Sequence, residues 1–246
     1  MSISINKTVV VVGASSGVGR AVAVRFLAEG WQVALVGRRK NALVETIRLA
    51  PAAAATRAAS FVCDISDPNA VDAMALAVLD RFTRVDVLVN CAGTNIARRS
   101  WKEMSRADYH ALLATNVHGV VYCVQAFLPG LRAQRNGTII NINSDAGLQA
   151  SAKAGAAYVA SKFALTGLTQ SLNAEERGNG IRACSIFPGD INTPLLDRRP
   201  QPPPPEARAQ MLQAEDIAAC VWLAATLPER AIIEELVIRP RCAQRS

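Results

Sequence analysis

Histidine and closely spaced cysteines are scarce in this sequence, which argues against most metal and redox sites. Only two histidines occur in 246 residues, and no two of the six cysteines lie closer than 22 positions. That spacing matches neither a zinc ribbon nor a CxxC redox motif, and it is typical of buried thiols in a reducing compartment. His110 and His118 lie eight positions apart on one predicted helix, too far to act as a pair on adjacent turns, so we expect no metal site. The cysteines are Cys63, Cys91, Cys123, Cys184, Cys220 and Cys242.

Long apolar runs and a targeting leader are also lacking. No run approaches the roughly 18 residues of a membrane-spanning helix. The segment Met1–Lys7 carries neither a basic leader nor an apolar core with a cleavage site. We therefore expect a cytoplasmic protein with no membrane partner. A length of 246 residues with 50% hydrophobic and 19% charged residues fits a single domain over residues 1–246.

The net charge of +7 raises the question of a nucleic-acid partner. The basic residues are scattered, however, and form neither a run of five nor a patch interleaved with aromatic residues. We therefore expect no nucleic-acid partner and favour acidic small molecules.

Short runs rich in valine, isoleucine and leucine alternate with helical patterns along the whole chain. Strands that are apolar on both faces are typical of a parallel sheet covered by helices on both sides. The alternation predicts an α/β fold, a Rossmann-like doubly wound parallel β-sheet of about seven strands flanked by helices on both faces. The predicted strands are Thr8–Val12, Gln32–Gly37, Ala58–Cys63, Val85–Asn90, Thr138–Asn143, Arg182–Phe187 and Glu235–Arg239. The predicted helices are Gly17–Glu29, Lys40–Leu49, Pro68–Phe82, Ser105–Leu131, Tyr158–Arg177 and Glu206–Leu227.

The segment Arg198–Pro205 interrupts this alternation with four consecutive prolines, which favour a stiff, extended chain. A linker between two domains is one interpretation, but too few residues follow it to form a second core. We expect instead a proline-rich loop on the substrate side, at about residues 195–210.

Tyr158 and Lys162 lie one helical turn apart, where two side chains are surface neighbours. A free phenol has a pKa near ~10, and lowering it to neutrality takes about 4 kcal/mol. A cation at about 4 Å supplies roughly that amount at an effective dielectric of ~20. The pair therefore predicts a tyrosine that works as an acid or base, although this spacing also arises by chance.

Three glycines, Gly13, Gly17 and Gly19, lie between the first predicted strand and the first predicted helix. Glycine allows the tight turn and lets the backbone approach a pyrophosphate, whose charge is met by the helix N-terminus. The same stretch also fits the G-x-S-x-G elbow of α/β-hydrolases around Ser15. Only one strand precedes Ser15, and His110 falls in a predicted helix, so we disfavour a hydrolase.

Further motifs follow the later strands: Asp64 after the third, Asn90-Cys-Ala-Gly93 after the fourth, Ser144 after the fifth and Pro188-Gly-Asp-Ile-Asn-Thr193 after the sixth, with Asn116 in the long predicted helix. Together with the glycine turn and the Tyr158/Lys162 pair, they resemble the short-chain dehydrogenase/reductase family in its single-domain branch, over essentially the whole chain. Val12 stands where the family usually has threonine, and Cys91 replaces the second asparagine of the family's NNAG motif. The resemblance implies an oxidoreductase that interconverts carbonyls and alcohols. The cofactor-binding residues that it implies are Gly13, Ser15, Ser16, Gly17, Val18, Gly19, Arg38, Arg39, Asp64, Ile65, Asn90, Ala92, Gly93, Tyr158, Lys162, Pro188, Gly189, Ile191 and Thr193.

The resemblance also implies catalytic roles for four residues. Tyr158 exchanges the proton with the substrate oxygen, and Lys162 lowers the pKa of Tyr158 and binds the nicotinamide ribose. Ser144 donates a hydrogen bond to the substrate oxygen. Asn116 holds a water that relays protons from Lys162 to solvent.

The second predicted strand ends in Gly37-Arg38-Arg39, with glycine where an acid would bind the ribose 2′-hydroxyl of NAD. Arginine there accommodates a 2′-phosphate, so we expect NADP(H), with Arg38 as the principal contact and Arg39 as the secondary one.

Two other functions share parts of this pattern. A sensor or scaffold that binds the cofactor without catalysis is expected to have lost Ser144, Tyr158 or Lys162, and all three are present. Sugar-nucleotide epimerases and dehydratases share YxxxK and resemble this fold, but they carry an added C-terminal substrate domain. We therefore disfavour this function for a sequence of 246 residues. By resemblance, we also expect a homodimer or homotetramer that pairs through the two long helices.

The substrate is less well determined. The tail Glu234–Pro240 resembles a subgroup that acts on short hydroxy acids and small alcohols. Four arginines fall in loops expected at the carboxyl ends of the strands, where ligands bind. One of them could bind a substrate carboxylate, or all could be solvated surface residues or oligomer contacts. They are Arg98, Arg99, Arg198 and Arg199.

Overall fold

Seven parallel strands form one sheet in the computed structural model, which describes residues 7–241. The sheet has the order β3-β2-β1-β4-β5-β6-β7. The Rossmann-like fold predicted from the sequence is therefore confirmed, and the strand ends differ from the prediction by at most two residues. The chain reverses its direction of winding between β1 and β4, where such sheets bind ligands. The strands are β1 (Thr8–Val12), β2 (Gln32–Gly37), β3 (Ala58–Val62), β4 (Val87–Asn90), β5 (Gly137–Ile142), β6 (Ile181–Pro188) and β7 (Glu235–Ile238).

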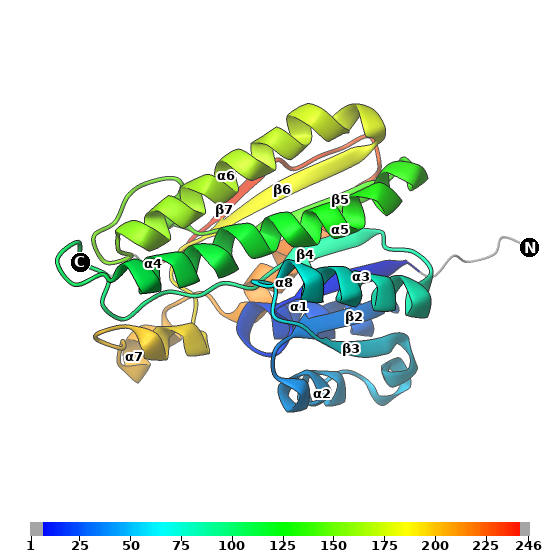
Figure 1. Cartoon of the computed structure of the whole chain (residues 1–246). Coiled ribbons are helices and arrows are strands. Elements are labelled where there is room, and N and C mark those ends of the chain that lie inside the picture. The colour runs from blue at the N-terminus through cyan, green and yellow to red at the C-terminus, as the bar shows by residue number, and fades with distance from the viewer. Residues whose placement is uncertain (1–6, 242–246) are drawn as a thin grey trace, which may run out of the picture.

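Helices cover both faces of this sheet (Figure 1). The valines of β1 alternate between two cores: Val9 and Val11 face one, and Val10 and Val12 face the other. The first core is closed by α1 (Gly17–Ala28), α2 (Lys40–Arg48) and α8 (Ala214–Thr226). The second is closed by α3 (Pro68–Phe82), α5 (Gly119–Gln134) and α6 (Ala156–Glu176). Short 3-10 turns lie at Ala52–Arg57, Asp145–Gly147, Arg177–Asn179 and Pro194–Arg198.

The predicted helix Ser105–Leu131 is not a regular α-helix. A π-helical turn at Ala114–His118 separates α4 (Arg106–Leu113) from α5. Asn116 lies in that turn and makes hydrogen bonds with both backbone groups of Thr94. These bonds compensate for the irregular turn, which is the kind of bulge often found at functional sites.

The helix Arg106–Gln134 is long and apolar enough to cross a membrane, by length and composition alone. The continuous apolar runs of the sequence do not indicate it. In the fold it packs between α3 and α6, and Arg132 on it makes a bidentate ion pair with Glu176 of α6. Its buried apolar side chains, among them Val120, Cys123 and Phe127, therefore lie in the second core.

The predicted helix Glu206–Leu227 is two helices, α7 (Pro205–Ala209) and α8. The chain between them is extended at Leu212, which is buried and pairs with Ile191 in a parallel bridge. Gln213 and Asp216 then form a capping box that starts α8. Burial of Leu212 thus overrides the continuous helical pattern, and α7 stands apart from the sheet below α4 in Figure 1.

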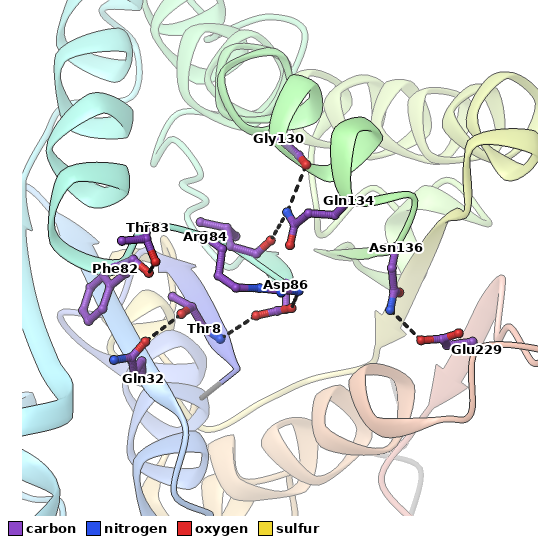
Figure 2. Close-up of polar contacts among 11 residues, drawn as sticks. Thr8, Gln32, Phe82, Thr83, Arg84, Asp86, Gly130, Gln134, Asn136 and Glu229 are labelled. Atoms are coloured by element: carbon purple, nitrogen blue, oxygen red, sulfur yellow. Dashed lines mark hydrogen bonds and ion pairs between the residues drawn. The ribbon is translucent and has the colours of Figure 1, made fainter. Parts of the chain in front are cut away.

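The amino ends of the central strands are tied together by side-chain hydrogen bonds (Figure 2). Asp86 accepts a hydrogen bond from the backbone N–H of Thr8 at 2.8 Å and pairs with Arg84. Gln134, at the end of α5, donates to the carbonyl oxygen of Val85 at 2.9 Å. These contacts fix the end of the sheet opposite to the ligand-binding edge, which leaves the carboxyl ends of the strands open for a site.

Candidate functional site

Two cavities lie at the carboxyl ends of the strands and meet at Tyr158. The first, of about 370 Å³, extends from the glycine turn after β1 to Lys162 on α6. The second, of about 850 Å³, lies between Ser144, the segment around Lys153 and the loop after β6. Tyr158 borders both cavities, so a group bound in one can meet a group bound in the other at the phenol.

The glycine turn is shaped so that no side chain fits where the backbone must pass. Gly13 has φ +88°, and a Cβ atom there would lie 2.7 Å from the backbone nitrogen of Ala92. A Cβ atom on Gly19 would lie 2.3 Å from the carbonyl oxygen of Gly13. The turn therefore presents bare backbone and the N-terminus of α1 to the first cavity, an arrangement suited to a pyrophosphate.

Most of the predicted cofactor residues line this first cavity. Three do not. Asn90 is buried under it and donates a hydrogen bond to Asn141 at 2.9 Å, while Pro188 and Gly189 border the second cavity. The predicted residues that line the first cavity are Gly13, Ser15, Ser16, Gly17, Val18, Gly19, Arg38, Arg39, Asp64, Ile65, Ala92, Gly93, Tyr158, Lys162, Ile191 and Thr193.

The two arginines after β2 take different positions. The Arg38 guanidinium lies 3.6 Å from the carboxylate of Asp64, and both side chains are exposed. The Arg39 guanidinium donates to the hydroxyls of Ser15 and Ser16, at 3.2 and 2.9 Å. Arg39 therefore lies over the glycine turn, whereas part of the charge of Arg38 is already met by a carboxylate.

Lys162 is buried and donates a hydrogen bond from Nζ to the carbonyl oxygen of Ile142 at 2.9 Å. Its Nζ atom is 5.6 Å from the centroid of the Tyr158 ring. Burial lowers the pKa of Lys162 to about 8, and the neighbouring Cys91 thiol acts in the opposite direction. The lysine is therefore closer to neutrality than an exposed one.

The expectation that Lys162 lowers the pKa of Tyr158 does not hold in the protein alone. Burial raises the pKa of Tyr158 to about 12 and outweighs the Ser144 hydroxyl, which acts to lower it. Asp145 also raises the pKa, whereas Arg199 and Arg99 lower it. The phenol therefore keeps its proton at neutral pH, which is the form that can donate it.

Ser144 and Asn116 are held by local hydrogen bonds. Ser144 follows β5, accepts a hydrogen bond from the backbone N–H of Ala146 at 3.2 Å and borders the second cavity. Asn116 is buried and donates to the carbonyl oxygen of Thr94 at 2.9 Å and to the hydroxyl of Ser161 at 3.2 Å. Asn116 borders neither cavity directly, so its contact in this structure is to the backbone that follows Gly93.

Asn143 borders both cavities and was not predicted as a site residue. It accepts a hydrogen bond from the backbone N–H of Ser144 at 3.0 Å and donates to Thr166 on α6 at 3.0 Å. It therefore fixes the serine relative to the helix that carries Tyr158. Its position at the end of β5, next to Ser144, was the available signal.

The histidines and cysteines lie outside this arrangement, apart from Cys63 and Cys91, which line the first cavity. His110 and His118 are exposed. Within residues 7–241, no three His, Cys, Asp or Glu side chains gather in a way that could hold a metal ion. The five cysteines in that range are free thiols, and Cys242 lies outside the described residues.

Comparison with known proteins relates the chain to enzymes of one family. The sequence model of the short chain dehydrogenase family matches residues 7–203. Sulfoacetaldehyde reductase 2 from Chromohalobacter salexigens is 33% identical, over 94% of this chain and 93% of its own length. A metagenomic short-chain oxidoreductase solved with NADP is 34% identical, with a TM-score of 0.83 over 98% of this chain and all of its own. The closed form of serine dehydrogenase with NADP⁺ is 28% identical, with a TM-score of 0.86 over 97% of each chain.

Proposed function

The chain belongs to the short-chain dehydrogenase family, and from that membership we propose that it is an NADP(H)-dependent oxidoreductase that interconverts a carbonyl and a secondary alcohol. The observation that carries this proposal is Tyr158 at the junction of the two cavities, with Lys162 on one side and Ser144 on the other. We further propose short hydroxy or oxo acids as substrates. The substrates named for two relatives, sulfoacetaldehyde and serine, each carry an ionised acid group, which supports this choice.

Reduction of a carbonyl adds a hydride to carbon and a proton to oxygen. When bound, the nicotinamide supplies the hydride. The protein supplies the proton from Tyr158 Oη, which borders the cavity and is protonated at neutral pH. Ser144 Oγ borders the same cavity and donates a hydrogen bond to the oxygen as negative charge develops there. In the oxidising direction, the phenol must first lose its own proton, and the tyrosinate then takes the proton of the alcohol.

The residues of the first cavity fit a phosphorylated dinucleotide. The glycine turn leaves room for a pyrophosphate, and Arg39 is held by Ser15 and Ser16 at the edge of that turn. Arg38 is partly neutralised by Asp64. The geometry therefore favours Arg39 over Arg38 as the principal contact for a 2′-phosphate, the reverse of the order expected from the sequence.

We expect kcat/KM with NADPH to exceed that with NADH by about 10–100-fold, because charge-assisted hydrogen bonds contribute roughly 1.5–3 kcal/mol each. Arg39→Ala should remove most of this preference, and Arg38→Ala a smaller part. Steady-state kinetics with both coenzymes measures it. Equal or better turnover with NADH, or an unchanged preference in both variants, would show that the coenzyme assignment is wrong.

The reaction class is tested by following NADPH oxidation with a panel of ketones, aldehydes, oxo acids and acyl thioesters. Turnover of a ketone or an oxo acid is the expected result. Binding of NADPH without turnover of any carbonyl would favour the alternative, a catalytically inactive NADP-binding sensor or scaffold. Nothing in the comparisons supports that alternative, and Ser144, Tyr158 and Lys162 are all in place.

We also propose that the protein acts in the cytoplasm as a homodimer or homotetramer. The long apolar helix Arg106–Gln134 supports assembly, because only 39% of its most apolar window is buried within the chain. On α6, Phe163 is 45% exposed. Two helices with exposed apolar side chains are suited to a twofold contact between subunits.

A further inference from the structure

The four arginines that the sequence places near the substrate divide into two pairs. Arg98 points to Asp108 at 3.8 Å and does not border the second cavity. Arg198 donates to the hydroxyl of Thr94 at 3.2 Å and borders the first cavity. Arg99 and Arg199 border the second cavity together with Tyr158. This second pair therefore shares with Ser144 and Tyr158 the cavity in which we propose that the substrate binds.

Arg199 is already engaged by a carboxylate. Its guanidinium donates to Asp190 at 2.5 Å, and the other oxygen of Asp190 accepts from Lys153 Nζ at 3.0 Å. One carboxylate thus serves two cations, and the ion pairs join the loop after β6 to the segment before α6. The charge of Arg199 is therefore partly neutralised within the protein.

Arg99 is held firmly but by neutral groups. It donates from Nε to the carbonyl oxygen of Ile96 at 3.0 Å, from Nη1 to that of Lys153 at 3.2 Å and from Nη2 to that of Arg198 at 3.4 Å. Its Cβ atom packs on Gly155, where an added Cβ would lie 2.6 Å away. No carboxylate within the described residues 7–241 lies within ion-pair distance of it, and three of its five N–H groups are used.

The second cavity therefore carries more positive than negative charge. Four cations border it against two carboxylates, Asp145 and Asp190. Burial lowers the pKa of Arg99, and repulsion by the positive charge of Arg199 on the same cavity lowers it further. A bound anion would relieve that repulsion. The cations are Arg99, Lys153, Arg199 and Arg239.

We propose that Arg99 binds the acid group of a small anionic carbonyl substrate, with Arg199 beside it, and so determines the specificity of the enzyme. The inference rests on the proposed function for the identity of the reacting group. Arg99 is attached to three segments that border the cavity, so its position is fixed before a ligand arrives. A preorganised guanidinium that already has a rigid support loses little freedom on binding an oxyanion.

The test compares acetoacetate with its methyl ester, which has the same carbonyl but no charge, at saturating NADPH. The wild type should favour the acid. Arg99→Gln should lower the ratio of kcat/KM for acid over ester by about 10–150-fold, and Arg99→Lys should keep part of it. Arg98→Gln, a neighbour on the same loop that points outside the cavity, should leave the ratio unchanged. Equal reduction of acid and ester by the wild type, or an unchanged ratio in Arg99→Gln, overturns the proposal.

A binding measurement separates this proposal from the reaction class. Butyrate and butyramide are titrated calorimetrically into the NADPH-loaded protein. Preference for butyrate in the wild type and in Arg98→Gln, lost in Arg99→Gln, supports the anion site even where no carbonyl is turned over. Such a result without turnover would contradict the proposed oxidoreductase activity alone. Equal affinities for butyrate and butyramide in the wild type would contradict the role of Arg99 alone. Unchanged NADPH affinity and Tm in Arg99→Gln show that the variant is folded.

Discussion

Tyr158→Phe is expected to lower kcat for carbonyl reduction by about 10²–10⁴-fold, the usual contribution of a positioned proton donor. Phenylalanine fills nearly the same space beside Lys162 but has no proton to give. Among the described residues that border the second cavity, Tyr158 is the only phenol. Of the two cavities, the Lys162 ammonium borders only the first, and the Lys153 ammonium in the second is paired with Asp190, so neither lysine is placed to replace the lost proton donor.

The affinity for NADPH separates loss of the proton donor from loss of the fold. Titration of protein fluorescence should give a Kd for NADPH within about threefold of the wild type, because the ring still packs at the junction of the cavities. Tyr122→Phe is the matched control, since Tyr122 lies on α5 and borders neither cavity. A Tyr158→Phe enzyme that keeps a tenth of the activity would rule out the assignment of Tyr158 as the proton donor.

The sheet could be predicted from the sequence because its signals are local. Each strand is a short apolar run, and two glycines of the first turn, Gly13 and Gly19, occupy positions where a side chain would meet backbone. Alternation of strands and helices then indicates a parallel doubly wound sheet, since crossover connections have one hand. The same reasoning brings the glycine turn, Tyr158 and Lys162 to one edge.

The departures from the prediction come from contacts between distant segments. The π-helical turn around Asn116 satisfies the backbone of Thr94, and the break before α8 pairs Leu212 with Ile191. The apolar pattern of each predicted helix gives no sign of these distant partners. In both places a regular helical turn is lost, and the tertiary contacts compensate for its loss. Irregular elements of this kind cannot be read from apolar periodicity alone.

The direction in which loop side chains point could not be predicted from the sequence either. Arg98 and Arg99 are neighbours in the sequence, yet one faces Asp108 and the other faces the cavity. Likewise, Arg38 lies beside Asp64, whereas Arg39 lies over the glycine turn. The pKa of Tyr158 depends on how deeply the ring is buried, which the YxxxK motif does not reveal. The sequence therefore predicted a lowered pKa, whereas burial raises the pKa of Tyr158 in the protein without ligands.

Lys162→Met is expected to reduce activity and cofactor affinity together, unlike Tyr158→Phe. The ammonium lies 5.6 Å from the centroid of the Tyr158 ring and borders the first cavity, where we propose that it binds the ribose of the nicotinamide. Loss of a charged hydrogen bond should weaken NADPH binding by about 10–150-fold, and kcat should fall by at least about 10²-fold. Lys102→Met, at an exposed position that borders neither cavity, should change neither quantity. A Lys162→Met enzyme with unchanged NADPH affinity would refute the ribose-binding role.

The same substitution should not destabilise the protein without cofactor at pH 7. Burial lowers the pKa of Lys162 to about 8, so the folded state holds this proton less tightly than the unfolded state and the charged lysine opposes folding. Methionine removes that penalty at the cost of one hydrogen bond, the one to the carbonyl oxygen of Ile142.

The wild type should gain stability as the pH rises from about 8 toward 10.5, where the lysine is neutral only in the folded state, and the methionine variant should lack this gain. The advantage in Tm of Lys162→Met should thus be greatest below pH 8 and shrink above it. A Tm that falls by several degrees at pH 7 would mean that Lys162 stabilises the fold, and the contrast between stability and activity at this position would not exist.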